Sequence, residues 1–237
     1  MGGRSSAQVR FNQRGQLVWE GNLSLENNGG FVSLRSQSPW ADWSSYDGVE
    51  VVFEAPGRDV QVSVQRGDMV LRAGGYRAMV PAEAEGDTHV FIPFSAFVLK
   101  RFGRAIRGPA LREGLKQIGR LGLLIADKRE GPFKVVLKSI QPAHFAEGMR
   151  LSSKVRPVLV KAIEAGVPVF NGGDHKGCAL IYRKALRGLS DASLLGKGTW
   201  ALRVSKHALK RASQQSDTEA AWTLRGAIDA ILKSSSD

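Results

Sequence analysis

Short runs of alternating apolar and polar residues, separated by Gly, Pro and Asp, constrain the fold of the first 145 residues most strongly. The alternation is clearest at Val60, Val62 and Val64, a period of two that a β-strand presents on one face. No helical pattern that could supply crossover connections interrupts these runs, so the sequence favours an antiparallel β-sandwich over an α/β fold. The expected strands include Leu17–Trp19, Gly48–Ala55, Asp59–Arg66, Met69–Leu71 with Tyr76–Val80, Thr88–Phe94, Gln117–Asp127 and Phe133–Ile140.

The stretch Gly21–Ser36 predicts a β-hairpin. Leucines alternate with polar residues before Asn27-Asn28-Gly29-Gly30, and a second apolar run follows this tetrapeptide. Asn and Gly tolerate a positive φ at little steric cost, so four such residues in succession favour a tight reversal of the chain. We expect Asn28 or Gly29 to adopt a positive φ. Asn27 and Asn28 are also candidate binding residues.

Four sequence blocks resemble those of a known family, and they follow the order found there: Gly21–Phe31, Tyr46–Glu50, Ile92–Ser95 and Leu124–Phe133. Over residues 1–145 the chain thus resembles the complex I intermediate-associated proteins. The resemblance implies a jelly-roll β-sandwich of the galactose-binding-like kind. It also implies an assembly factor for NADH:ubiquinone oxidoreductase, or for photosynthetic complexes as in some relatives.

The first residues depart from the family pattern. Family members carry Asp-Gly-Val and a first strand before the motif Met1-Gly2-Gly3, whereas this sequence begins inside the motif. Either the true start lies further upstream or the sandwich lacks an edge strand, which would leave backbone groups unpaired. We favour the upstream start, which would also place any targeting segment before Met1.

Composition limits the class of protein. The 237 residues, 43% of them hydrophobic, suffice for one full core and a second, smaller one. The single cysteine, Cys178, excludes an internal disulfide and a multi-cysteine zinc site. No run approaches the ~20 apolar residues that a transmembrane helix needs. The expected location is the cytoplasm, with attachment to the periphery of a membrane as an option.

The net charge of +12 predicts an anionic partner surface, such as membrane headgroups, an acidic protein or RNA. Phe97–Arg120 is expected to be a basic, mostly irregular loop, and residues 148–237 carry 15 Lys and Arg against 7 Asp and Glu. Solvated surface charge is an equal alternative. The candidate binding cations are Lys100, Arg101, Arg104 and Arg107 in the loop, and Arg203, Lys206 and Lys210 at helical spacing.

Two further pairs are candidate ligand contacts. Trp40 and Trp43 lie three residues apart in a polar loop, a spacing that suits a stacking platform for a sugar or a base. Burial at one end of the sandwich is the favoured alternative. Asp127 and Lys128 lie in a charged turn that could bind a partner. An Asp in a tight turn more often hydrogen-bonds its own backbone.

The period changes from two to 3.6 after Pro142. Three to four short amphipathic helices are expected, and they bury their apolar stripes only by packing together. Residues 150–237 are therefore expected to form a small all-α module, separate from a sandwich at residues 1–145. Its signals are Ser152 and Ser153 as caps of a helix that Gly166 ends, Asp174 as the next cap, a third helix at Thr199–Ala212, and a Ser216/Glu219 capping box.

Catalytic chemistry has little support in the sequence. None of the four histidines lies in a catalytic motif, and neither a P-loop nor a dinucleotide-binding glycine motif is present. His175 and Cys178 have the spacing of two metal ligands, but no second pair completes the site, and a buried cysteine is favoured. We expect no enzyme activity, cofactor or metal. The predicted function is an assembly factor that binds protein subunits of a larger complex, with a carbohydrate-binding module or an RNA-binding accessory protein as alternatives.

Overall fold

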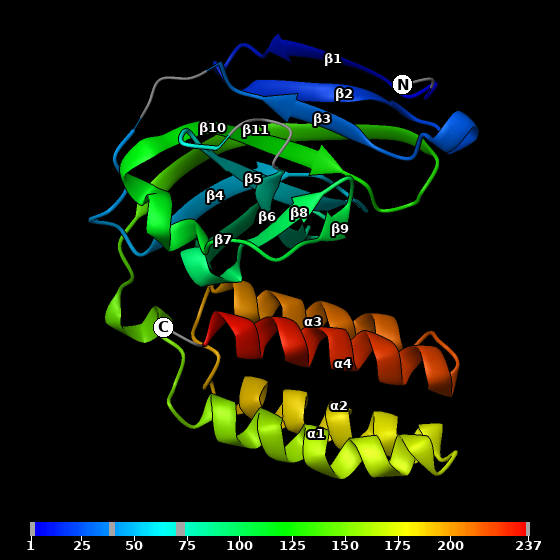
Figure 1. Ribbon diagram of the computed structural model, residues 1–237. Helices are drawn as coiled ribbons and strands as arrows, with labels where there is room; N and C mark the ends of the chain where they lie inside the picture. The colour runs from blue at the N-terminus through cyan, green and yellow to red at the C-terminus, as the bar shows by residue number, and fades with distance from the viewer. Residues whose placement is uncertain (1–2, 38–40, 70–73, 236–237) are drawn as a thin grey trace. The chain divides into compact units, whose positions relative to one another are not determined.

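A computed structural model describes residues 3–37, 41–69 and 74–235 (Figure 1). The chain divides into two compact units, Met1–His144 and Phe145–Asp237. The first unit is built from strands and short 3-10 segments, and the second contains the α-helices.

The first unit is a sandwich of two antiparallel sheets, as the sequence predicts. We call the five-stranded sheet, in the order β1-β2-β11-β4-β7, sheet A, and the six-stranded sheet, in the order β3-β10-β5-β6-β8-β9, sheet B. The strands of sheet A are β1 (Ser6–Phe11), β2 (Leu17–Leu23), β11 (Gly131–Ala143), β4 (Gly48–Glu54) and β7 (Thr88–Pro93). Those of sheet B are β3 (Val32–Arg35), β10 (Ile118–Ile125), β5 (Asp59–Arg66), β6 (Gly75–Pro81), β8 (Val98–Arg101) and β9 (Arg104–Ala105).

Alternation along the strands sets the core between the two sheets. Val60 and Val62 on β5 are 0% exposed, whereas the intervening Gln61 is half-buried on the other face of sheet B. Trp19 of β2 packs edge-on against Phe133 of β11, with ring centroids 5.0 Å apart. Because β5 buries one face, a shift of its pairing by one residue would expose these valines, and the positions of its apolar residues therefore fix its register.

The predicted hairpin at Gly21–Ser36 is wrong. β2 pairs with β1 and β11 in sheet A, whereas β3 pairs with β10 in sheet B, so this segment crosses from one sheet to the other. The 3-10 turn η1 (Glu26–Asn28) lies between them. Positive φ angles occur at Asn27 (53°) and Gly30 (90°), not at Asn28 or Gly29. The Asn and Gly residues allow the chain to turn here, but strands that are distant in the sequence determine which partners β2 and β3 pair with.

The predicted irregular loop at Phe97–Arg120 contains regular structure. β8 and β9 form a short hairpin at the edge of sheet B, and the 3-10 segment η4 (Leu111–Gln117) leads into β10. Leu99, Leu111 and Leu115 are buried. These few buried leucines are interspersed with many basic residues, so the sequence of this segment shows no clear strand or helix period.

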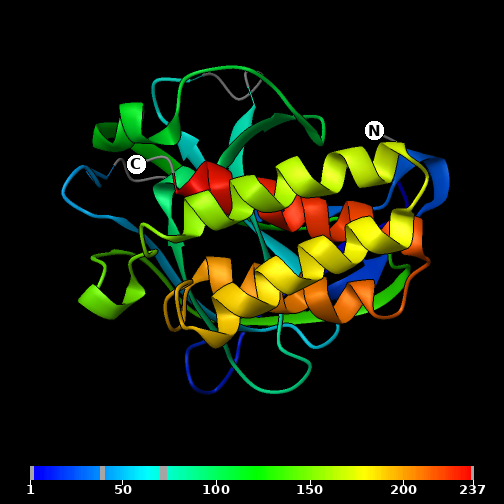
Figure 2. The same cartoon turned by 90° about the horizontal axis from the view of Figure 1, so that it is seen from below.

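Four helices form the second unit: α1 (Val155–Asn171), α2 (His175–Asp191), α3 (Trp200–Ala212) and α4 (Asp217–Ser234). Figure 2 shows them from a second direction. Asp174 caps α2 by accepting a hydrogen bond from the backbone N of Gly177 at 2.7 Å, and Ser216 with Glu219 forms the predicted capping box of α4. Thr199 caps α3.

Gly166 does not end the first helix, contrary to the prediction. α1 continues to Asn171, and a Cβ at Gly166 would lie 2.4 Å from Cε1 of Tyr182 on α2. The glycine therefore serves the packing of two helices. A glycine inside a helix reads as a stop signal when its neighbour on another helix is unknown.

Candidate interaction site

The hairpin of β8 and β9 divides the predicted basic group between two faces of sheet B. Arg101 pairs with Arg104, and Lys100 pairs with Ala105. Cross-strand partners share a face and successive residues alternate, so Arg101 and Arg104 lie on one face and Lys100 on the other. Arg107 is exposed beyond the end of β9.

Phe102 and Gly103 form the tip of this hairpin, and both have a positive φ, 49° and 78°. Positive φ at both central residues of a two-residue loop marks a type I′ turn, which favours Asn-Gly. A bulky side chain in this region is a conformational outlier that costs on the order of 1–3 kcal/mol. The Phe102 side chain is nevertheless 91% exposed. The chain thus holds an aromatic ring in solvent at a conformational cost, with an arginine on each side.

The base of the hairpin is anchored to sheet B. The backbone N of Ile106 donates to the carbonyl of Leu99 at 3.0 Å, which extends the pairing beyond β9. The hydroxyl of Tyr76, a residue 1% exposed, donates to the carbonyl of Pro109 at 2.8 Å. Since the returning chain is fixed in this way, the tip projects from a firm base. We call Arg101–Arg104 the Phe102 tip.

Sequence reasoning identified the flanking arginines but not Phe102. A signal was present, because Phe-Gly between two basic residues occupies the position that a hairpin loop needs. The signal was missed because the surrounding segment was expected to be irregular.

The tryptophan candidates do not form an observed platform. Trp43 is 5% exposed, and its ring stacks on Phe94 with centroids 6.2 Å apart and an interplanar angle of 25°. The Trp43 ring is therefore not accessible for stacking with a ligand. Trp40 lies outside the described residues.

Asp127 is committed to a structural role in its turn. Its side chain is 0% exposed and lies 3.1 Å from Nη1 of Arg58, whose side chain is 7% exposed. Arg58 also donates to the carbonyls of Gly131 and Pro132 at 3.0 and 2.9 Å. The neighbouring Lys128 is exposed with φ 59°. Sequence reasoning missed Arg58 because its partner is 69 residues away.

The remaining candidates lie apart from the Phe102 tip along the chain. Asn27 is exposed in η1, and the side chain of Asn28 lies outside the described part of the chain. On α3, Lys206 and Lys210 are exposed, whereas Arg203 is half-buried.

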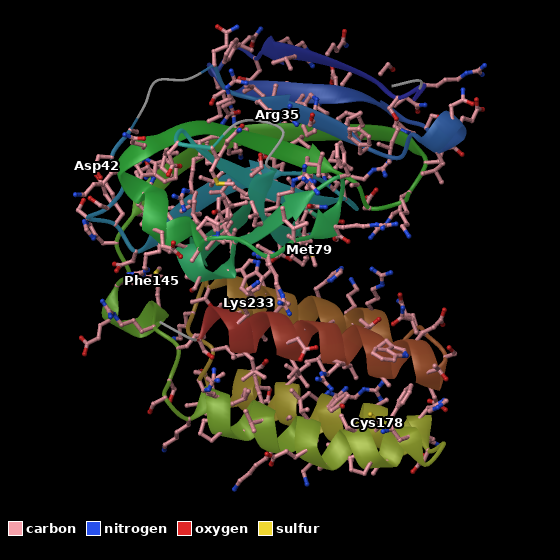
Figure 3. The ribbon with its side chains drawn as sticks, in the orientation of Figure 1. Arg35, Asp42, Met79, Phe145, Cys178 and Lys233 are labelled. Atoms are coloured by element: carbon pink, nitrogen blue, oxygen red, sulfur yellow. The ribbon has the colours of Figure 1, made fainter. Side chains whose placement is uncertain are left out.

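His175 and Cys178 have separate surroundings. The His175 ring stacks on Phe170 at 4.3 Å, and its Nδ1 lies 2.7 Å from the hydroxyl of Thr218. Cys178 is 1% exposed within the helical unit (Figure 3). Among the described residues, no group of three or more His, Cys, Asp and Glu is placed to hold a metal ion. No helix in this part of the chain has the length and apolarity needed to cross a membrane.

Comparison with solved structures finds carbohydrate-active proteins at low similarity. A family 11 carbohydrate-binding module from Clostridium thermocellum, solved with a β-1,3-1,4-mixed-linked tetrasaccharide, has 17% identity and a TM-score of 0.43, covering 62% of this chain and 86% of the module. The agarase AgWH50C has 10% identity and a TM-score of 0.41, covering 69% of this chain and 29% of the agarase. Such low similarity assigns no ligand to this chain.

Comparison with curated proteins finds no match. The sequence model of Complex I intermediate-associated protein 30 matches residues 1–137, which is more than half of the chain. This match spans the sandwich from its first residues into β11. The chain therefore belongs to the complex I intermediate-associated protein 30 (CIA30) family.

Proposed function

We propose that this protein is a non-enzymatic assembly factor that binds protein subunits of a respiratory or photosynthetic membrane complex during biogenesis. Family membership carries the proposal, because the family is named for its association with complex I intermediates. We place the protein in the cytoplasm, at the periphery of the membrane that holds the complex.

Within the sandwich, the Phe102 tip is the surface best suited to bind a subunit. Burying a phenylalanine side chain that is 91% exposed contributes about 1.5–3 kcal/mol if the partner covers it fully. Aromatic and arginine side chains dominate the energetic centres of protein interfaces. The anchored base holds the backbone of the hairpin in position before contact, so less backbone freedom is lost on binding.

Arg101 and Arg104 indicate the charge of the partner. They lie opposite each other in the hairpin, and two like charges so placed disfavour each other in the free protein. An acidic surface on the partner would relieve this repulsion. Capture of the partner should then weaken between low and moderate salt, because screening reduces attraction between exposed charges.

Replacing Phe102 by Asn separates recognition from folding. Asn tolerates a positive φ, so Phe102→Asn should raise the melting temperature while removing the ring. Tagged parent and variant would be expressed in the native cell, and captured subunits of NADH:ubiquinone oxidoreductase and of photosynthetic complexes would be quantified by mass spectrometry. We expect the parent to enrich subunits of one such complex and Phe102→Asn to lose them.

Phe11 provides a matched control, because it is 70% exposed and lies on β1, away from the hairpin in sequence and sheet order. Phe11→Asn should retain the captured subunits. Retention by Phe102→Asn would place the interface elsewhere on the protein. Failure of the parent to enrich any subunit would contradict the assembly role itself.

The carbohydrate alternative loses its main structural support, since it depended on an exposed pair of tryptophans and Trp43 is buried. The RNA alternative depends on the basic charge alone. Sequencing RNA recovered in the same capture experiment tests it without a separate preparation.

A further inference from the structure

Three cations gather on the outer face of sheet B, on the side opposite the core. The register places Arg35, Gly122, Ser63 and Arg77 in one row across β3, β10, β5 and β6. Lys100 on β8 pairs with Gly75, two residues before Arg77 on the same strand. Alternation along the strands therefore puts Arg35, Arg77 and Lys100 on one face. Arg101 and Arg104 of the Phe102 tip lie on the other face.

Gly122 lets the side chains of Arg35 and Ser63 approach each other. A Cβ built at Gly122 would lie 3.2 Å from Cγ of Arg35 and 2.8 Å from Oγ of Ser63. The Arg35 chain thus extends over the glycine from one side, while the Ser63 hydroxyl reaches over it from the other. Figure 3 labels Arg35 on β3. The glycine therefore leaves room for the Arg35 side-chain stem and the Ser63 hydroxyl on the sheet surface.

These charges have no counterion in the described part of the chain, where Arg35, Arg77 and Lys100 make no ion pair. Burial lowers the pKa of Lys100, and the charge of Arg77 lowers it further. Burial likewise lowers the pKa of Arg77, with a further contribution from Arg35. Half-buried cations that repel one another are destabilised until an anion joins them.

A polar atom without a partner lies on the same face. Gln61 is two residues from Ser63 on β5, and its Oε1 is buried with no hydrogen bond among the described residues. Buried amide oxygens are normally hydrogen-bonded. This unsatisfied amide oxygen marks a polar position on the same face as the three cations.

We propose that Arg35, Arg77 and Lys100 bind a phosphoryl group over Gly122 and Ser63. Guanidinium groups match the oxygens of a phosphoryl group through paired N–H donors, and an ammonium adds a third positive charge. The Ser63 hydroxyl makes no hydrogen bond among the described residues, so it is available as a neutral donor. The source of the group is either a small soluble phosphate ester or the headgroup of an anionic lipid.

Calorimetric titration of the full chain with inorganic phosphate tests the site, with ionic strength held constant by chloride. We expect one phosphate per chain. Arg35→Gln and Arg77→Gln should each weaken binding about tenfold or more, the usual effect of losing a charge-assisted hydrogen bond. Arg14→Gln is the matched control, because Arg14 is an exposed arginine in the turn between β1 and β2. It should leave the affinity within about twofold of the parent, as a distant screened charge does.

Two further arms identify the ligand. Acetate should bind much more weakly than phosphate, and equal binding would overturn the assignment of a phosphoryl group. Vesicles of phosphatidylcholine with and without phosphatidic acid distinguish the sources, since selective binding to phosphatidic acid supports a lipid headgroup and phosphate binding without vesicle binding supports a soluble ester.

The proposal is overturned if the chain binds neither phosphate nor phosphatidic acid. It is also overturned if Arg14→Gln weakens binding as much as Arg35→Gln and Arg77→Gln do. Thermal melting of each variant shows whether it is folded. If Arg77→Gln fails to fold, Arg35→Gln decides the outcome, because Arg35 is exposed.

Discussion

The guanidinium of Arg58 and the carboxylate of Asp127 lie 3.1 Å apart, with side chains that are 7% and 0% exposed. Replacing Arg58 by Gln should lower the free energy of unfolding of the sandwich by about 3–5 kcal/mol, because it removes the cation nearest to a buried carboxylate. Denaturant titration measures this change. Arg10→Gln is the control, because Arg10 also lies 3.1 Å from its partner Glu20, but its side chain is 51% exposed.

Arg10→Gln should lower the free energy of unfolding by no more than about 1 kcal/mol, because exposed ion pairs contribute little to stability. Equal losses in the two variants would show that burial does not govern the Arg58 pair. The two pairs share the same N–O distance and differ in burial and in the carbonyl hydrogen bonds that Arg58 also makes.

Gly166 should be irreplaceable in α1 although alanine is the better helix former. Its Cβ would meet the Tyr182 ring at 2.4 Å, so Gly166→Ala should destabilise the helical unit despite a propensity gain of about 1 kcal/mol. Gly188 on α2 has nothing within 4 Å of a built Cβ, so Gly188→Ala should raise the melting temperature. A stabilised Gly166→Ala variant would mean that the two helices can separate without loss.

Local signals predicted the helical unit better than the sandwich. Asp174 and the Ser216/Glu219 pair act within three residues of their partners, so sequence suffices to find them. The pairing of β3 with β10, by contrast, joins Arg35 to Gly122, and nothing near Arg35 announces this partner. The row of cations on sheet B could not be predicted for the same reason, because its members lie on different strands. Residues that meet only through strand register cannot be grouped by reading the chain in order.

Gly29 should be more sensitive than Gly57, although only Gly57 has a positive φ. Gly29 has φ −68°, but a Cβ there would lie 2.6 Å from the carbonyl O of Ser24 and 2.8 Å from that of Glu26. Gly57 has φ 69° and open space around it. Gly57→Ala should cost about 1–2 kcal/mol from backbone strain alone.

Gly29→Ala must displace two carbonyls that accept hydrogen bonds in the same turn, from Gly30 and from Gly29 itself. Its loss should therefore exceed that of Gly57→Ala in thermal melting. The reverse order would indicate that the turn relaxes freely.

Glu50 should make stability depend on pH in the acidic range. The hydrogen bond from His89 at 2.7 Å, followed by that from Gln141 at 2.8 Å, holds the pKa of Glu50 below its ordinary value of 4.5. A carboxylate with a lowered pKa stabilises the folded state above its unfolded pKa, and this contribution is lost as the pH falls through the folded pKa. The advantage of the parent over Glu50→Gln should therefore shrink below about pH 4.5.

Gln141→Met removes one of the two hydrogen bonds to Glu50. The advantage of the parent over Gln141→Met should also shrink as the pH falls, but by a smaller amount than its advantage over Glu50→Gln. Denaturant titrations of the three proteins at several pH values supply the comparison. A difference between parent and Glu50→Gln that stays constant across this range would contradict the assigned role of His89 and Gln141.

The connection between the two units should be the first site of limited proteolysis. On the sandwich side, the ring of His144 lies 4.9 Å from that of Tyr46. On the helical side, the backbone N of Ser152 donates to the carbonyl of Leu194 at 3.1 Å. Between these contacts lies the short 3-10 turn η5 (Glu147–Met149), in which Glu147 is exposed. A protease specific for glutamate should therefore cut after Glu147 before it cuts within the strands or helices.

The expected products are a sandwich fragment ending at Glu147 and a helical fragment beginning at Gly148, which would support separable domains at 1–145 and 150–237. Glu147→Gln should abolish this cut and leave the remaining pattern unchanged. Mass spectrometry of the earliest fragments identifies the site. First cleavage in Phe97–Arg120, at Glu113, would instead show that η4 opens more readily than the connection, and the chain would then behave as one body with a labile loop.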